Sequence, residues 1–352
     1  FKMTREEAMI NDASIFFRDG IRAGAFTSKG SMGPDEKAAL KKWLELLAVS
    51  LPPEWGLHVL IEHLLISLDV VSKSVAEMNK VLNKHRLPQS MWSDSCKKSK
   101  LGAMKCGMYK LLHTVSLGIA EHRGGLNLVE SGMVEHNKTT FSPAEAGDAI
   151  HDYIMYFVRE ESCRKDFLDS YDNCDYRLCH RLSESKEESL PDDWKQVSLW
   201  IWEVHNADNL IFLNTTVNKN VKSKGGKLPT MEQEIKALWP PLNECLVCID
   251  DSGEWNEDAV FEYLERSYWE GPDTKYDKLL SFKRLHGQDF TAGGFIWFML
   301  VGAVAVALIA ARQIKGASTN HGLKRPKSTS VSVSDINRKL AEFMVGNFNV
   351  KK

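Results

Sequence analysis

The sequence predicts an all-α fold for the large N-terminal part of the chain, followed by a single transmembrane helix. Two observations predict helices throughout that part. Apolar residues recur at spacings of three and four positions, and no pair of alternating apolar and polar runs flanks a hairpin turn. A third observation predicts the membrane span, because residues 292–311 form an uncharged run of 20 residues.

The composition is that of a globular protein. The 352 residues are 43% hydrophobic and 26% charged, which is enough for one large or two modest cores and excludes a wholly disordered chain. The 45 basic and 47 acidic residues give a net charge of −2. A chain so nearly neutral has no overall field to attract polyanions, so we expect no nucleic-acid partner.

The N-terminal region is expected to be rich in helices. Pro34 lies in the first turn of one predicted helix, with acidic residues beside it, and the apolar positions that follow have the helical period: Leu40, Trp43, Leu44 and Leu47. A second segment ends near Ser72 and carries the apolar residues Leu60, Ile61, Leu64, Leu65 and Leu68. Residues 1–88 are therefore predicted to form a helix-rich region.

Further helices are expected over four ranges, which are 104–120, 143–169, 192–213 and 256–267. Polar loops are expected over 183–188 and 218–226.

The apolar run near the C-terminus predicts a membrane-spanning helix over residues 292–312. At about 1.5 Å per residue, 20 residues cross a hydrocarbon core of roughly 30 Å. A buried core helix is the alternative, but soluble helices rarely extend so far without a charged side chain. Basic residues follow the run and acidic ones precede it, so the tail over 313–352 is expected in the cytosol.

The large N-terminal part would then be lumenal, anchored in a secretory-pathway membrane of the Golgi or endoplasmic reticulum. Sequons at Asn137 and Asn214 both fall on the predicted lumenal side. The chain opens at Phe1 without an initiator Met, so we expect a processed form or a fragment.

Seven cysteines are arranged as three close pairs and one single residue. In a lumenal protein such pairs tend to be disulfides, and the spacing offers Cys96 with Cys106, Cys174 with Cys179, and Cys245 with Cys248. Cys163 is left alone. Cys245 and Cys248 could instead form half of a zinc site, but no second Cys/His pair has a suitable spacing, and we expect no metal.

Three motifs occur in order along the middle of the chain. Residues 106–114 read Cys-Gly-Met-Tyr-Lys-Leu-Leu-His-Thr, residues 202–209 read Trp-Glu-Val-His-Asn-Ala-Asp-Asn, and Trp239-Pro240-Pro241 precedes Cys245 and Cys248. Together they resemble the FAD-binding, Erv-type domain of the quiescin sulfhydryl oxidases. The resemblance covers roughly residues 88–270. No thioredoxin-type Trp-Cys-x-x-Cys motif occurs in the sequence, so we expect a fragment without that family's thioredoxin domains.

The resemblance implies a helical bundle that holds FAD beside a redox-active cysteine pair. The cofactor contacts that it implies are Tyr109, His113, Trp202, His205, Asn206, Asn209, Lys236 and Trp239. Taken singly, His113 or Trp202 would usually be a core residue, and only their occurrence together in the family's order favours cofactor contact. The implied division of the chain is a helix-rich region over 1–88, the Erv-type domain over 89–270, a linker over 271–291, the membrane helix and the tail.

The departures from the family pattern fall at the active cysteines. Cys163 keeps the flavin-side position, but Glu160 stands where the outer cysteine is expected. Asp166 replaces a His, Asp208 replaces a Val, and Gly102 replaces an Arg that precedes the first motif. A disulfide cannot form between Glu160 and Cys163, so the usual two-electron exchange is blocked.

Two functions are compatible with this sequence. The first is an FAD-dependent thiol oxidase that forms disulfides and reduces oxygen to hydrogen peroxide, with Cys163 facing the flavin and a partner drawn from Cys174 and Cys179. Cys245 and Cys248 would serve as a distant shuttle. Its partners would be thiol-containing client proteins or a thioredoxin-like disulfide carrier, oxygen and membrane lipid.

The second function is that of a catalytically impaired, membrane-anchored scaffold or client-binding module, which Glu160 and Asp166 favour.

Overall fold

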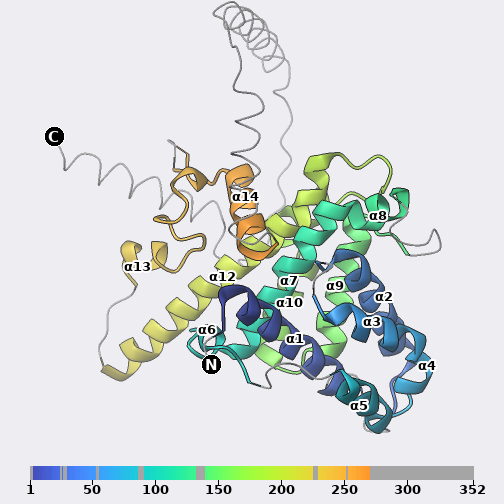
Figure 1. Cartoon of the computed structure of the whole chain (residues 1–352). Helices are drawn as coiled ribbons and strands as arrows, with labels where there is room; N and C mark the ends of the chain where they lie inside the picture. Colours follow the sequence, from blue (N-terminus) through green and yellow to red (C-terminus); the bar gives the residue numbers. More distant parts are fainter. Residues whose placement is uncertain are drawn as a thin grey trace, which may run out of the picture. The chain divides into compact units, whose positions relative to one another are not determined.

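The computed structural model describes residues 3–23, 26, 30–52, 55–85, 91–131, 139–224, 229–250 and 253–269. These residues fall within one compact unit. Helices make up its regular structure, and the described ranges contain no β-strand beyond an isolated bridge between Ile249 and Trp255. The predicted all-α class is therefore confirmed for this part of the chain (Figure 1).

The α-helices follow one another in chain order. They are α1 (Arg5–Ala23), α2 (Pro34–Ser50), α3 (Leu57–Ile66), α4 (Leu68–Val71), α5 (Val75–Lys84), α6 (Asp94–Lys97), α7 (Ala103–His122), α8 (Leu126–Glu130), α9 (Pro143–Phe157), α10 (Glu161–Asp172), α11 (Leu178–Arg181), α12 (Pro191–Lys224), α13 (Met231–Ile235) and α14 (Glu257–Tyr268). Three short 3₁₀ turns, η1 (Arg123–Gly125), η2 (Asp175–Arg177) and η3 (Leu246–Cys248), lie between them.

Helix α7 is the centre of the core. Most of its side chains are buried from Met108 to Ile119, and it packs against α1, α2, α12 and α14 (Figure 1). A helix that is buried on nearly all sides must be surrounded by other helices. The helix-rich region over 1–88 and the segment that carries the three motifs therefore share one core.

Helix α2 begins as the sequence predicts. Pro34 is its first residue, Asp35 and Glu36 follow in the first turn, and Leu40, Trp43, Leu44 and Leu47 are fully buried. The second predicted segment is interrupted earlier than expected, because α3 ends at Ile66 and Ser67 separates it from the short α4.

The single helix predicted over 143–169 is wrong, since two helices occupy this range. Helix α9 starts with a capping box in which Ser142 and Glu145 satisfy each other's backbone amides, and it ends at Phe157. Val158 and Glu160 adopt extended conformations, so α10 starts a new axis at Glu161. A β-branched residue such as Val158 fits an extended backbone better than a helix. The break places Cys163 in the first turn of α10.

Helix α12 is longer than predicted, because it continues to Lys224. The loop predicted over 218–226 is therefore wrong for residues 218–224.

All three cysteine pairs offered by the spacing are disulfides. Their Cα–Cα distances are 5.4 Å for Cys96–Cys106, 5.4 Å for Cys174–Cys179 and 5.3 Å for Cys245–Cys248, as such bonds require. Cys96–Cys106 joins α6 to α7. Because Cys245 and Cys248 are bonded to each other, their sulfurs are not available as half of a zinc site.

Within the described ranges, no helix is both long enough and apolar enough to cross a bilayer. The predicted linker over 271–291, the predicted span over 292–312 and the predicted tail over 313–352 all lie outside those ranges. The sequon at Asn137 also lies outside them, whereas Asn214 lies on α12 and is half-buried.

Candidate functional site

Helices α7 and α12 bring most of the predicted cofactor residues together. Tyr109 and His113 lie one turn apart on α7, and Trp202, His205 and Asn206 share a stretch of α12 that packs against α7. Trp239 joins them from the segment after α13. A periodicity of 3.6 residues places positions four apart on the same helical face. Tyr109 and His113 therefore share one face of α7, and Trp202 and Asn206 share one face of α12.

The aromatic rings of this group form a continuous cluster, which we call the aromatic cluster and which consists of Tyr109, His113, His205, Trp239 and Tyr268. The Tyr109 ring stacks on His205 with centroids 4.0 Å apart. His113 stacks on Tyr268 at 4.7 Å and lies 5.5 Å from Trp239. Tyr268, at the end of α14, is a member that the sequence motifs did not indicate.

The backbone of Trp239 is held by α12 from two sides. The Asn206 side chain donates to the Trp239 carbonyl at 2.7 Å and accepts from the Trp239 amide at 2.8 Å. The Trp202 indole donates to the same carbonyl. Asn206 and Trp202 therefore act on the cluster by fixing Trp239.

Both histidines of the cluster are neutral at physiological pH. Burial lowers the pKa of His205 to about 3, with Lys105 contributing, and burial together with His205 lowers the pKa of His113 well below its ordinary value. A hydrogen bond of 3.1 Å joins His113 Nε2 to His205 Nδ1. His113 is fully buried, and its Nδ1 has no hydrogen-bond partner among the described residues.

Two predicted contacts are not members of the aromatic cluster. Lys236 is exposed at the end of α13 and pairs with Glu232. Asn209 is half-buried on α12, one turn beyond Asn206.

A buried charged network lies against Tyr109. Lys105 forms ion pairs with Asp166 and Asp208, both at 2.9 Å, and the Tyr109 hydroxyl donates to Asp208 at 2.7 Å. Burial lowers the pKa of Lys105, but the two carboxylates outweigh burial and raise it, so Lys105 stays charged. The family pattern has a His and a Val where this chain has Asp166 and Asp208, and two acids at such positions indicate a nearby cation. The motifs did not identify Lys105 as that cation.

Cys163 is the one free cysteine among the described residues and is buried. Burial strongly raises the pKa of its thiol, and Glu160, which also hydrogen-bonds to it, raises the pKa further, while Lys105 opposes them. A thiol in this environment is a poor nucleophile at neutral pH. Cys163 lies one turn before Asp166 on α10, and Asp166 is linked to Tyr109 through Lys105 and Asp208, so the thiol lies on the side of α10 that faces the aromatic cluster.

Helix α10 separates Cys163 from the disulfide that was expected to serve it. Cys163 lies in the first turn and Cys174 lies two residues beyond the last turn. The ten helical residues from Cys163 to Asp172 extend roughly 14 Å along the axis, whereas a disulfide needs Cα atoms within about 7 Å. The structure does not bring Cys163 together with Cys174 and Cys179.

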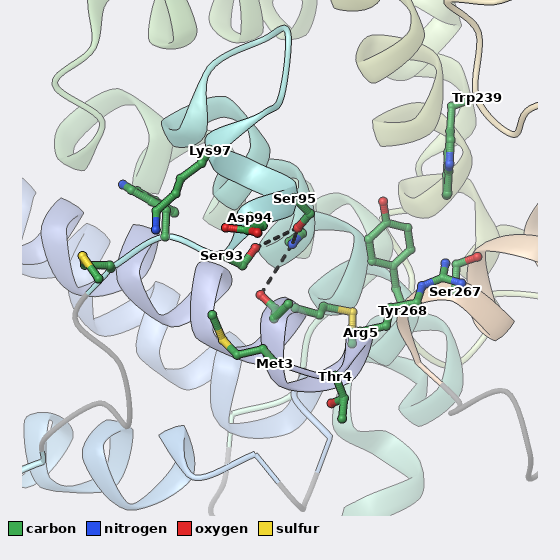
Figure 2. A pocket seen from close by; sticks show the side chains of 15 residues that line it. Met3, Thr4, Arg5, Ser93, Asp94, Ser95, Lys97, Trp239, Ser267 and Tyr268 are labelled. Carbon is green, nitrogen blue, oxygen red and sulfur yellow. Dashed lines mark hydrogen bonds between the residues drawn. The ribbon is translucent and has the colours of Figure 1, made fainter. Parts of the chain in front are cut away.

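A cavity of about 880 Å³ adjoins the aromatic cluster. Trp239 and Tyr268 line one wall, and Ser93 and Ser95 line another (Figure 2). Lys110 also lines the cavity. Lys110 donates to Ser95 at 2.8 Å and to the buried Asp12 at 2.6 Å. This volume lies within the range of small-molecule sites.

The aromatic cluster and the cavity fit a flat, nitrogen-rich ligand such as a flavin nucleotide. Trp239 and Tyr268 line the cavity, where their rings can contact a flat ligand, and Tyr109, His113 and His205 pack behind them. A buried polar atom without a partner is rare in proteins, and His113 Nδ1 is a group that a ligand can satisfy.

Comparisons with known proteins point in the same direction as the motifs. No protein-family model matches the chain. Sulfhydryl oxidase 1 of Oryza sativa subsp. japonica is 27% identical over 204 residues, which cover 56% of this chain and 32% of the rice protein. The chain thus spans about a third of the length of that curated relative.

Among solved structures, the sulfhydryl oxidase fragment of human QSOX1 is similar in fold. The TM-score is 0.50 at 16% sequence identity, and the match covers 76% of this chain and 97% of the human fragment. The chain is therefore similar in sequence to a sulfhydryl oxidase, and its helical fold is similar to that of the human fragment.

Proposed function

We propose that this chain is an FAD-linked thiol oxidase module, which forms protein disulfides and reduces oxygen to hydrogen peroxide. The observation that carries the proposal is the aromatic cluster around the unpartnered His113 Nδ1, with Cys163 close to it. The sulfhydryl oxidase relatives support the same function. When bound, FAD would accept two electrons from thiols and pass them to oxygen.

The chain's own residues would bind and orient the cofactor. Tyr109, His113, His205 and Trp239 would provide its ring contacts, while Asn206 and Trp202 hold Trp239 in place. The neutral state of both histidines lets one ring nitrogen accept a hydrogen bond from a ligand. The buried position of Cys163 would keep water from its sulfur.

A second candidate is an FAD-binding scaffold whose turnover is impaired. Two observations favour the scaffold. The pKa of the Cys163 thiol is strongly raised, and the carboxylate of Glu160 stands in place of a partner sulfur. Both act against formation of the thiolate that thiol–disulfide exchange requires.

Spectroscopy and oxygen uptake together test both candidates. Under the oxidase proposal, the purified chain is yellow, releases FAD on denaturation and consumes oxygen with a small dithiol, and Cys163→Ser abolishes the oxygen uptake while FAD stays bound. A yellow protein that is inert, and gains activity only in Glu160→Cys, supports the scaffold. A folded, colourless protein that does not take up FAD overturns both.

The proposed setting is a secretory-pathway membrane, with residues 292–312 as the single span and thiol-containing clients or a thioredoxin-like disulfide carrier as partners. The uncharged run and the basic residues that follow it support this orientation. Sealed microsomes provide the test, since protease should remove the tail and a glycosidase should shift the mass of the protected part. Protection of the tail would reverse the orientation.

A further inference from the structure

The three described disulfides differ in exposure. Cys245 and Cys248 are buried, and Cys96 is buried against a half-buried Cys106. Cys174 is half-buried and Cys179 is exposed. An incoming thiolate must reach a disulfide sulfur along the S–S axis, so access controls which disulfide reacts.

The loop closed by Cys174 and Cys179 has an unusual backbone. Cys174, Tyr176 and Arg177 have φ angles of 56°, 57° and 62°. L-residues with side chains avoid this left-handed region because their Cβ crowds the carbonyl oxygen that follows. Only one other non-glycine residue of the described ranges, Arg123, shares it. Conformational strain is therefore concentrated in the loop that the disulfide closes.

Helix α12 anchors this loop, so the strain cannot relax by movement of the whole segment. The Arg181 guanidinium donates to Gln196 at 2.7 Å and pairs with the buried Glu203. The Trp200 indole donates to the Asp175 carbonyl at 3.1 Å. Breaking the disulfide would let Cys174, Tyr176 and Arg177 adopt ordinary φ angles, while the anchors at Asp175 and Arg181 keep the segment on α12.

We propose that Cys174–Cys179 is a thiol–disulfide exchange site that acts independently of Cys163. A substrate thiolate attacks the sulfur of the exposed residue Cys179, a mixed disulfide forms, and Cys174 leaves as a thiolate that takes up a proton. A second substrate thiolate then attacks the substrate sulfur of the mixed disulfide. The substrate gains one disulfide, and Cys174 and Cys179 are left as two thiols. A small-molecule disulfide such as oxidised glutathione returns them to the disulfide by the reverse exchange.

This activity goes beyond the proposed oxidase, because neither FAD nor oxygen takes part. The separation along α10 between Cys163 and Cys174 keeps the two sulfur centres apart. Anaerobic exchange and aerobic oxygen uptake can therefore be measured separately, and the failure of one does not imply the failure of the other.

The test is the rate at which each disulfide of the whole chain is reduced without oxygen by a small dithiol. Free thiols are alkylated at successive times and located by peptide mass spectrometry. We expect Cys174–Cys179 to open at least tenfold faster than Cys96–Cys106 and Cys245–Cys248. The Cys163→Ala variant should show the same rates. Equal rates for the three disulfides, or loss of the fast phase in Cys163→Ala, would overturn the proposal.

A matched pair of variants isolates the backbone strain. Arg177→Ala and Arg177→Gly remove the same charge, but only glycine adopts a positive φ without steric cost. We expect Cys174–Cys179 to open at least threefold more slowly in Arg177→Gly than in Arg177→Ala. Equal rates in the two variants would show that the strain does not drive the exchange. A Cys174→Ser/Cys179→Ser variant should fail to oxidise one equivalent of a dithiol peptide, which the wild-type chain should oxidise.

Discussion

Asp208 is the residue on which the buried charged network depends most. It is 5% exposed and pairs with Lys105, whereas Asp166, the second partner, is 36% exposed. Loss of the buried partner leaves a buried cation poorly compensated. We expect Asp208→Asn to lower the free energy of unfolding by about 3 kcal/mol, and Asp166→Asn by about 1 kcal/mol or less. Urea unfolding of both variants measures the difference, and equal losses would contradict this account of the network.

Glu203 makes stability depend on pH near neutrality. Burial raises its pKa to about 7, although Arg181 opposes the shift. Between the unfolded pKa near 4.5 and the folded value, the native state holds a proton that the unfolded state releases, so stability falls as pH rises. The loss attributable to this group is at most about 3 kcal/mol. The difference in unfolding free energy between wild type and Glu203→Gln should fall between pH 4.5 and 8, and a pH-independent difference would refute the assignment.

At the scale of elements, close packing of α7 against the end of α2 requires a glycine. A Cβ on Gly118 would overlap the Ser50 carbonyl oxygen, and Ser50 is the last residue of α2. Because both groups belong to helix backbones, the helices must separate to make room. We expect Gly118→Ala to lower the free energy of unfolding by at least about 2 kcal/mol.

Gly56 provides the matched control for this substitution. It has a negative φ, and a Cβ there would meet nothing within 4 Å. Gly56→Ala should change the free energy of unfolding by less than about 1 kcal/mol. Similar losses in the two alanine variants would show that α7 and α2 pack less closely than described.

At the scale of the whole molecule, FAD should stabilise the fold by binding only the native state. We expect added FAD to raise the thermal unfolding midpoint of the wild-type chain by several degrees, and His113→Ala to lose most of that rise. The His151→Ala variant is the control, because His151 lies on α9 and pairs with Asp152 and Asp172. A rise that His113→Ala retains would remove His113 from the cofactor site.

The sequence was sufficient for features that depend on neighbouring positions. The helical period of Leu40, Trp43 and Leu44 located α2, and the short spacing of the cysteines gave the three disulfides. The ordered motifs indicated the aromatic cluster, since each motif occupies a single helix or turn. Local patterns did not locate the break at Val158 or the full length of α12, because backbone conformation there depends on packing and solvent contact as well as on propensity.

By itself, the sequence determined that the described part of this chain is helical, that the chain carries paired cysteines and that Cys163 lacks a partner three residues away. Only the tertiary structure decided that Lys105 meets Asp166, which lies 61 positions further along the chain, and Asp208. It also decided which of the disulfides is exposed. The physical reason is that helical periodicity fixes the face on which a side chain lies, whereas burial and charge pairing depend on which other helix covers that face.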